Sequence, residues 1–168
     1  MKRTNLVLIG MPASGKSTVG VILAKLIGFD FMDTDLLIQR AQKRRLAQII
    51  ETEGIDGFLE IENRINTSVA ADHCVIATGG SAVYGKEAME HFGEIGHIIY
   101  LKVEYAQLAH RLRNIKQRGV VLREGQTLRN LYDERTALYE KYADTVIEEE
   151  GEVEDTVVQI LKRMGRQA

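Results

Sequence analysis

The sequence is poor in residues that crosslink, anchor or rigidify a chain, with one cysteine and one proline among its 168 residues. A single cysteine, Cys74, excludes an internal disulfide, so a reducing and cytoplasmic setting is expected. No apolar run approaches the roughly 20 residues that a membrane-spanning helix needs. The apolar stretch after the basic N-terminus is too short for a secretion signal, and we therefore expect no membrane partner.

Charge of one sign is also lacking, since 22 Lys and Arg residues face 24 Asp and Glu residues, for a net charge of −2. Such a chain has no overall positive field with which to grip nucleic acid, so nucleic acid is not an expected partner. Hydrophobic residues make up 45% and charged residues 27%, which is typical of globular proteins and argues against disorder. The length fits one domain over residues 1–168.

Short apolar runs alternate with longer segments of helical period, the pattern of a parallel sheet covered by helices. Strands are predicted at residues 5–9, 29–32, 74–77, 98–101 and 145–147. Helices are predicted at residues 17–27, 46–71, 86–91, 106–113, 128–142 and 153–164. The second of these helices is expected to be interrupted near Gly54 and Gly57.

Residues 10–17, GMPASGKS, fit the G-x-x-x-x-G-K-[ST] pattern of a phosphate-binding loop. The pattern lies between an apolar strand and an amphipathic helix, as such a loop must. Its glycines let successive N–H groups point at phosphate oxygens, and the helix adds its positive N-terminal end. The residues predicted to bind the nucleotide are Gly10, Ala13, Ser14, Gly15, Lys16, Ser17 and Thr18. Lys16 is expected to reach the β and γ phosphates, and Ser17 to join a Mg²⁺ shell.

Two carboxylates, Asp33 and Asp35, follow the second predicted strand. Ligands of open α/β sheets bind beyond the carboxyl ends of the strands, so this position favours function. One aspartate could hold Mg²⁺ through water while the other accepts a proton from a substrate hydroxyl. Alternatively, one of them caps the helix that starts near Leu36.

The ordered set of motifs resembles the shikimate kinase family over about residues 4–147. The matching residues are Asp33, Thr34 and Asp35, then Phe58 and Glu62 of an F-R-x-x-E stretch, residues 77–80 of A-T-G-G-G, the lid arginine Arg118, and Arg135 of R-x-x-L-Y-x-x-x-A-D. The resemblance implies an α/β, three-layer P-loop kinase fold with a five-stranded parallel sheet in the order 2-3-1-4-5. It also implies acceptor-binding helices at about residues 34–72, a mobile lid at about 114–127, and ATP and Mg²⁺ as cofactors. Folds of this kind usually work as monomers, so a monomer is expected.

The resemblance also implies a role for each matching residue. Lys16, Asp35 and Arg118 would be catalytic, with Arg118 stabilising charge on the transferred phosphoryl group. Ser17 and Asp33 would hold the metal, and Arg111 would lie along the adenine. Asp35, Gly79, Gly80 and Arg135 would bind a small hydroxy acid, with Arg135 pairing with its carboxylate.

Three residues depart from the family pattern: Leu59 replaces an arginine, Ser81 the third glycine and Gly119 a proline. The loss at Leu59 predicts weak binding of shikimate, improved by Leu59→Arg, unless another cation such as Arg45 or Arg64 compensates. The first candidate function is phosphorylation of shikimate by ATP. The alternatives are a kinase for a different hydroxy acid or hydroxy amino acid, and a non-catalytic ATP-binding regulatory domain.

Overall fold

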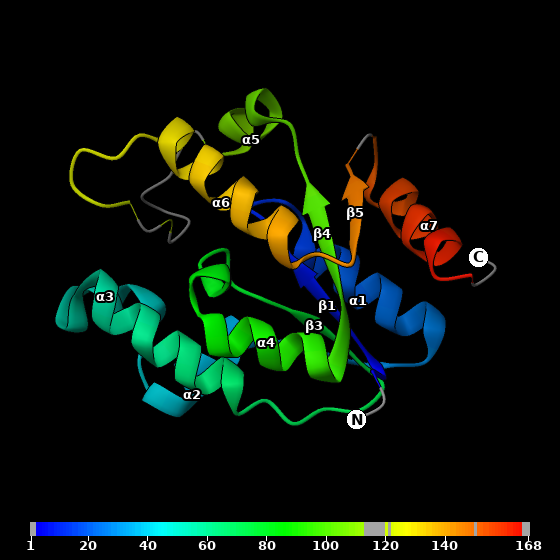
Figure 1. The fold of residues 1–168 in the computed structure, drawn as a ribbon, viewed down its shortest axis with the longest axis horizontal. Coiled ribbons are helices and arrows are strands. Elements are labelled where there is room, and N and C mark those ends of the chain that lie inside the picture. Colours follow the sequence, from blue (N-terminus) through cyan, green and yellow to red (C-terminus); the bar gives the residue numbers. More distant parts are fainter. Residues whose placement is uncertain (1–2, 113–119, 121, 150, 166–168) are drawn as a thin grey trace.

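The computed structural model describes residues 3–112, 120, 122–149 and 151–165. Its sheet contains β1 (Asn5–Ile9), β2 (Asp30–Asp33), β3 (Cys74–Ala77), β4 (Gly96–Lys102) and β5 (Thr145–Glu148). All paired strands are parallel, and their order is β2-β3-β1-β4-β5 (Figure 1). This confirms the predicted fold class and strand order.

The central strand β1 is buried along its whole length, because helices cover both faces of the sheet. Val7 and Ile9 point into one core cluster together with Phe92 of α4. Leu6 and Leu8 point into the other, which is shared with α1 and α7. In Figure 1, α1 and α7 lie on one side of the sheet, and α4 and α6 lie on the other. The apolar runs of β1, β3 and β4 are therefore core strands buried on both faces, whereas β2 and β5 at the sheet edges are more exposed.

The helices of the described residues are α1 (Lys16–Ile27), α2 (Thr34–Gln42), α3 (Leu46–Thr67), α4 (Lys86–Ile95), α5 (Tyr105–Arg111), α6 (Leu128–Tyr142) and α7 (Val153–Arg163), with a 3₁₀ turn, η1 (Ala82–Tyr84). Helix α4 continues beyond its predicted end at residue 91, because Phe92 and Ile95 are buried in the core. None of the described helices is long and apolar enough to cross a membrane.

Helices α2 and α3 stand away from the sheet and pack on each other through Ile38, Ile49 and Phe58 (Figure 1). The predicted interruption is at Gly54, whose backbone leaves the helical region with φ 73° and ψ 177°. Gly57 stays helical. Leu46 and Ile50 before this kink and Phe58 after it line the same cavity, so both parts of α3 contribute to the site.

Candidate active site

The loop after β1 is shaped by two glycines with positive φ. Gly10 has φ 149°, and a Cβ there would lie 2.7 Å from the Leu101 carbonyl oxygen. Gly15 has φ 79° and forms the N-cap of α1. Both positions favour glycine for steric reasons, and the loop leads directly into the positive end of α1.

The Lys16 side chain is folded back under this loop. Its Nζ donates hydrogen bonds to the carbonyl oxygens of Gly10 at 2.8 Å and Met11 at 2.7 Å, and to Ser14 Oγ at 3.3 Å. Burial lowers the pKa of Lys16 to about 8, and the nearby Asp35 carboxylate opposes that shift. The Lys16 ammonium group is thus held against the loop by hydrogen bonds, and an anion that binds there would raise its pKa and favour the charged form.

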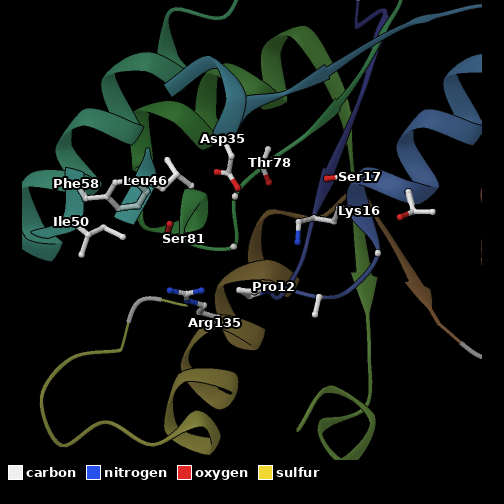
Figure 2. A pocket seen from close by; sticks show the side chains of 15 residues that line it. Pro12, Lys16, Ser17, Asp35, Leu46, Ile50, Phe58, Thr78, Ser81 and Arg135 are labelled. Carbon is white, nitrogen blue, oxygen red and sulfur yellow. The ribbon is translucent and has the colours of Figure 1, made fainter. Parts of the chain in front are cut away.

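A cavity of about 300 Å³ opens between the loop, the segment after β3, and helices α2, α3 and α6 (Figure 2). Its lining residues are Pro12, Ala13, Gly15, Lys16, Ser17, Thr18, Asp35, Leu46, Ile50, Phe58, Thr78, Gly79, Gly80, Ser81 and Arg135. Figure 2 shows Lys16, Asp35 and Arg135 around the open space, with Leu46, Ile50 and Phe58 at the end away from Lys16. The cavity therefore has a charged half and an apolar half.

Asp33 is the aspartate that caps the helix, and it also contacts the phosphate loop. Its Oδ1 accepts hydrogen bonds from the backbone N–H groups of Asp35 at 2.9 Å and Leu36 at 3.4 Å, which caps α2. Its Oδ2 accepts a hydrogen bond from Ser17 Oγ at 2.9 Å. Two oxygen ligands on neighbouring elements fit Mg²⁺, which keeps several waters and takes few protein ligands. In the described part of the chain no three His, Cys, Asp or Glu residues form a metal cage.

Asp35 faces the cavity from the first turn of α2. Burial raises the pKa of Asp35 to about 6, the charge of Asp33 adds to the rise, and that of Lys16 opposes it. A Cβ at Gly79 would lie 2.7 Å from Asp35 Oδ1 and 2.7 Å from Glu62 Oε1. A side chain at position 79 would therefore displace both acids. The carboxyl group has a pKa close to neutrality, as a general base needs.

Arg135 is a buried guanidinium in the wall of the cavity, with 2% of the residue exposed. Its Nε donates to Tyr84 Oη at 3.3 Å, and its guanidinium carbon lies 5.3 Å from the Tyr84 ring centre. A Cβ at Gly80 would lie 3.0 Å from Arg135 Nη1, so this glycine leaves the fork accessible. Tyr139 Oη donates to the Gly80 carbonyl at 2.6 Å, which ties α6 to the glycine pair.

Glu62 is a buried acid that the sequence identified only as a motif match. Ser81 Oγ donates a 2.6 Å hydrogen bond to Glu62 Oε2, while Oε1 has no partner among the described residues. Burial raises the pKa of Glu62 to about 7, and the Ser81 hydrogen bond opposes the rise. The serine that replaces the family's third glycine thus stabilises an acid next to Gly79.

Arg111 reaches the phosphate loop from α5. Its Nη1 donates to the Ala13 carbonyl at 3.1 Å and to Glu149 Oε2 at 2.7 Å. The Glu149 side chain, 4% exposed, was not a sequence candidate. No motif marks it, because the pair joins segments 38 residues apart. The contact fixes the guanidinium beside the loop.

Most of the predicted site residues therefore come together. Ala13, Gly15, Lys16, Ser17, Thr18, Asp35, Gly79, Gly80 and Arg135 line the cavity. Gly10 and Ser14 shape the loop, Asp33 contacts Ser17, and Arg111 contacts Ala13. Arg118, and with it residues 114–119 and 121 of the predicted lid, lies outside the described residues.

Comparison with protein families matches residues 12–165 to the family described as Shikimate kinase. Shikimate kinase 2 of Yersinia pseudotuberculosis is 40% identical over 105 residues, which are 62% of this chain and 60% of that protein. The match thus spans less than two thirds of that relative's length. Shikimate kinase of Thiobacillus denitrificans is 36% identical over 151 residues, covering 88% of this chain and 82% of the relative.

Among solved structures, shikimate kinase from Acinetobacter baumannii in complex with shikimate superposes with a TM-score of 0.85. It is 32% identical in sequence, and the alignment covers 96% of this chain and 92% of that one. The parallel sheet and the helices around the cavity thus have a counterpart that was solved with shikimate.

Proposed function

The chain belongs to the shikimate kinase family, and from that premise we propose that it transfers the γ-phosphoryl group of ATP to a hydroxyl group of shikimate. The observation that carries the proposal is the cavity itself, in which Lys16 of the phosphate loop, the Asp35 carboxyl group with its raised pKa and the buried Arg135 guanidinium face one space. Phosphoryl transfer depends mainly on positioning and charge stabilisation, which these groups supply.

The nucleotide half of the proposal rests on the loop from Gly10 to Ser17. Its backbone N–H groups and Lys16 would bind the phosphates, and Arg111 would lie along the adenine. Ser17 and Asp33 would hold Mg²⁺ with water, and the ion would neutralise phosphate charge. For Arg118 the proposed charge-stabilising role rests on the sequence resemblance alone.

The acceptor half uses Arg135 and Asp35. Arg135 would pair with the acceptor carboxylate, which turns a hydroxyl group towards Asp35. As the hydroxyl oxygen bonds to the γ-phosphorus, its proton passes to the Asp35 carboxylate, and the bond to the β–γ bridging oxygen breaks to leave ADP. The backbone of Gly79 and Gly80 would contact the acceptor, since both positions leave room only for a hydrogen atom.

We further propose a monomer in the cytoplasm. The support is the usual state of folds of this kind and the single cysteine, Cys74, which is buried in β3.

The test is ADP release with a panel of acceptors: shikimate, its methyl ester, smaller hydroxy acids and hydroxy amino acids. We expect the highest kcat/KM with shikimate, and formation of one equivalent of ADP per phosphorylated acceptor. If another acid gave a higher kcat/KM than shikimate, that acid would be identified as the acceptor instead. ATP binding without transfer to any acid would contradict the kinase assignment.

A further inference from the structure

A second and smaller cavity of about 80 Å³ adjoins the acceptor region on the far side of Arg135. Leu59, Tyr84, Arg123, Gln126, Glu134 and Arg135 contribute to its lining. Arg135 lines both cavities, so a carboxylate bound to this guanidinium would lie at their common wall. What lines the second cavity therefore affects the binding of an acidic acceptor.

Position 59 is where the family pattern has an arginine, and here it brings a leucine to the second cavity. The cavity nevertheless contains a second guanidinium, that of Arg123, which comes from the segment before α6. The described cations that line the two cavities are Lys16, Arg123 and Arg135. Arg45 and Arg64, the sequence candidates for compensation, are exposed and line neither cavity.

The Arg123 guanidinium already lies close to position 59. Its Nη2 donates to Asp56 Oδ1 at 2.6 Å. Asp56 and Leu59 are three residues apart in the helical part of α3, so their side chains start about 5–6 Å from each other on one face. The family pattern places a guanidinium group at position 59 of α3. Here Arg123, from the segment before α6, brings a guanidinium group to nearly the same place.

The ion pair with Asp56 restrains the Arg123 side chain only weakly. The two side chains are 56% and 77% exposed, and exposed ion pairs of this kind contribute little to stability. The backbone of Arg123 is fixed by a turn, in which its N–H donates to Gln126 Oε1 at 3.2 Å and its carbonyl accepts from the Gln126 N–H at 3.0 Å. A change of partner therefore needs rotation of the side chain only.

The charges around the second cavity favour such a change when an acid binds. Glu134 lines this cavity and accepts a hydrogen bond from Tyr84 Oη, so one carboxylate already faces Arg135. An acceptor carboxylate at the common wall would add a second negative charge there. Asp56 is 77% exposed, so water can solvate it once Arg123 leaves it. Arg123 and Arg135 then balance Glu134 and the acceptor carboxylate, whereas Arg135 alone leaves an excess negative charge.

We propose that Arg123 is the second carboxylate-binding cation of the acceptor site and replaces the family arginine that is lost at Leu59. The inference rests on the proposed function, in which Arg135 binds the acceptor carboxylate. It makes Arg123 a specificity-determining residue for acids. It also changes the expectation from the sequence, because the parent protein should then bind shikimate well without an arginine at position 59.

The primary test is calorimetric titration of the parent, Arg123→Gln and Arg129→Gln proteins with shikimate and with its uncharged methyl ester. Arg129 is a matched control, an exposed arginine of α6 that pairs with Asp133 and lies outside both cavities. We expect Arg123→Gln to weaken shikimate binding about tenfold to a hundredfold, as for loss of one charge-assisted hydrogen bond. Ester and ATP binding should change less than about threefold, and Arg129→Gln should match the parent.

A second pair of variants separates the missing charge from a disturbed fold. Leu59→Arg should restore shikimate affinity in the Arg123→Gln protein, yet change it less than about threefold in the parent. Asp56→Ala, which releases Arg123, should not weaken binding. Equal affinity of the parent and Arg123→Gln for shikimate would overturn the inference, as would equal losses for acid and ester or failure of the rescue.

The outcomes also separate this inference from the proposed function. A parent protein that binds shikimate without phosphorylating it would contradict the kinase assignment, while the titrations still decide the role of Arg123. A parent protein that phosphorylates shikimate, with no loss in Arg123→Gln, would contradict only the inference about Arg123. A parent protein that does not bind shikimate would contradict both.

Discussion

The nucleotide region and the acceptor region share one cavity but are built in different ways. The nucleotide region is a contiguous loop, Gly10 to Ser17, whose shape follows from its glycines and from the start of α1. The acceptor region takes side chains from α2, α3 and α6 and two glycines after β3. The nucleotide region is thus one contiguous segment, whereas the acceptor region combines groups from four segments, with its lining charges, Asp35 and Arg135, on two of them.

This difference determines how each region responds to substitution. A phosphate loop that binds through backbone N–H groups depends on the path of its backbone. Few sequences allow that path, so a short residue pattern identifies such a loop. In a site built from side chains, one residue can replace another from a different element, because a cation binds a carboxylate equally well whichever helix or loop carries it. Leu59 and Ser81 depart from the family pattern on the acceptor side, and the role proposed for Arg123 would be an exchange of this kind.

The sharpest test of the nucleotide region is Lys16→Ala. Lys16 would neutralise phosphate charge that grows in the transition state, so we expect kcat to fall by more than about 10³-fold. Shikimate affinity by calorimetry should change less than about threefold, because the acceptor charges remain. Lys25→Ala, at the exposed end of α1, is the control and should retain full activity. Turnover within tenfold of the parent would remove the loop lysine from the mechanism.

On the acceptor side, Asp35→Asn should lower kcat/KM at pH 8 by about 10²–10³-fold through loss of the proton acceptor. With a pKa of about 6, Asp35 is a carboxylate above that pH and is protonated below it. In the parent, kcat/KM should therefore fall about tenfold per pH unit below 6 and level off between about pH 7 and 8, where Lys16, with a pKa of about 8, begins to lose its proton.

The fall of kcat/KM at low pH, the acidic limb of the pH profile, should be absent from the Asp35→Asn protein. Glu62→Gln is the matched control, because Glu62 is the neighbouring acid with a raised pKa and lies outside the proposed proton path. If the limb vanished in Glu62→Gln and persisted in Asp35→Asn, the base would be misassigned.

Gly79→Ala tests the close packing of the acceptor side. The new Cβ would lie 2.7 Å from both Asp35 Oδ1 and Glu62 Oε1, so both acids must move. We expect the KM for shikimate to rise about 10- to 100-fold and the KM for ATP to change less than about threefold. Gly93→Ala is the control, since its Cβ would meet only Ile98 Cδ1, at 3.9 Å. An equal rise of both KM values would show that the two regions are not separable.

The smallest effect is expected for Glu149→Ala, which removes the partner of Arg111 beside the loop. Without its carboxylate the guanidinium loses its fixed position, and the KM for ATP should rise about three- to tenfold with little change in kcat. Glu148→Ala, at the exposed neighbouring position, should behave as the parent. An unchanged KM for ATP in Glu149→Ala would separate Arg111 from the adenine site.

Local patterns in the sequence predicted the sheet well. The inner strands β1, β3 and β4 are apolar runs buried on both faces, whereas the edge strands β2 and β5 are short and more exposed. β1, β3 and α6 have the predicted bounds. Helix α4 was predicted too short, since tertiary burial of Phe92 and Ile95 extends it past Gly93. The end of α3 was predicted too late, because the helix stops at Thr67.

The site residues also fall into a group that local sequence patterns predict and a group that depends on tertiary contacts. The sequence by itself determined the phosphate loop and the family, because their signals are residue types at short or ordered spacings. Only the tertiary structure decided that Asp33 both caps α2 and contacts Ser17, that Ser81 supports Glu62, and that Arg123 lies beside Asp56. These contacts join residues that are 67 positions apart in the case of Arg123, and charge pairs at such separations leave no periodic signal along the chain.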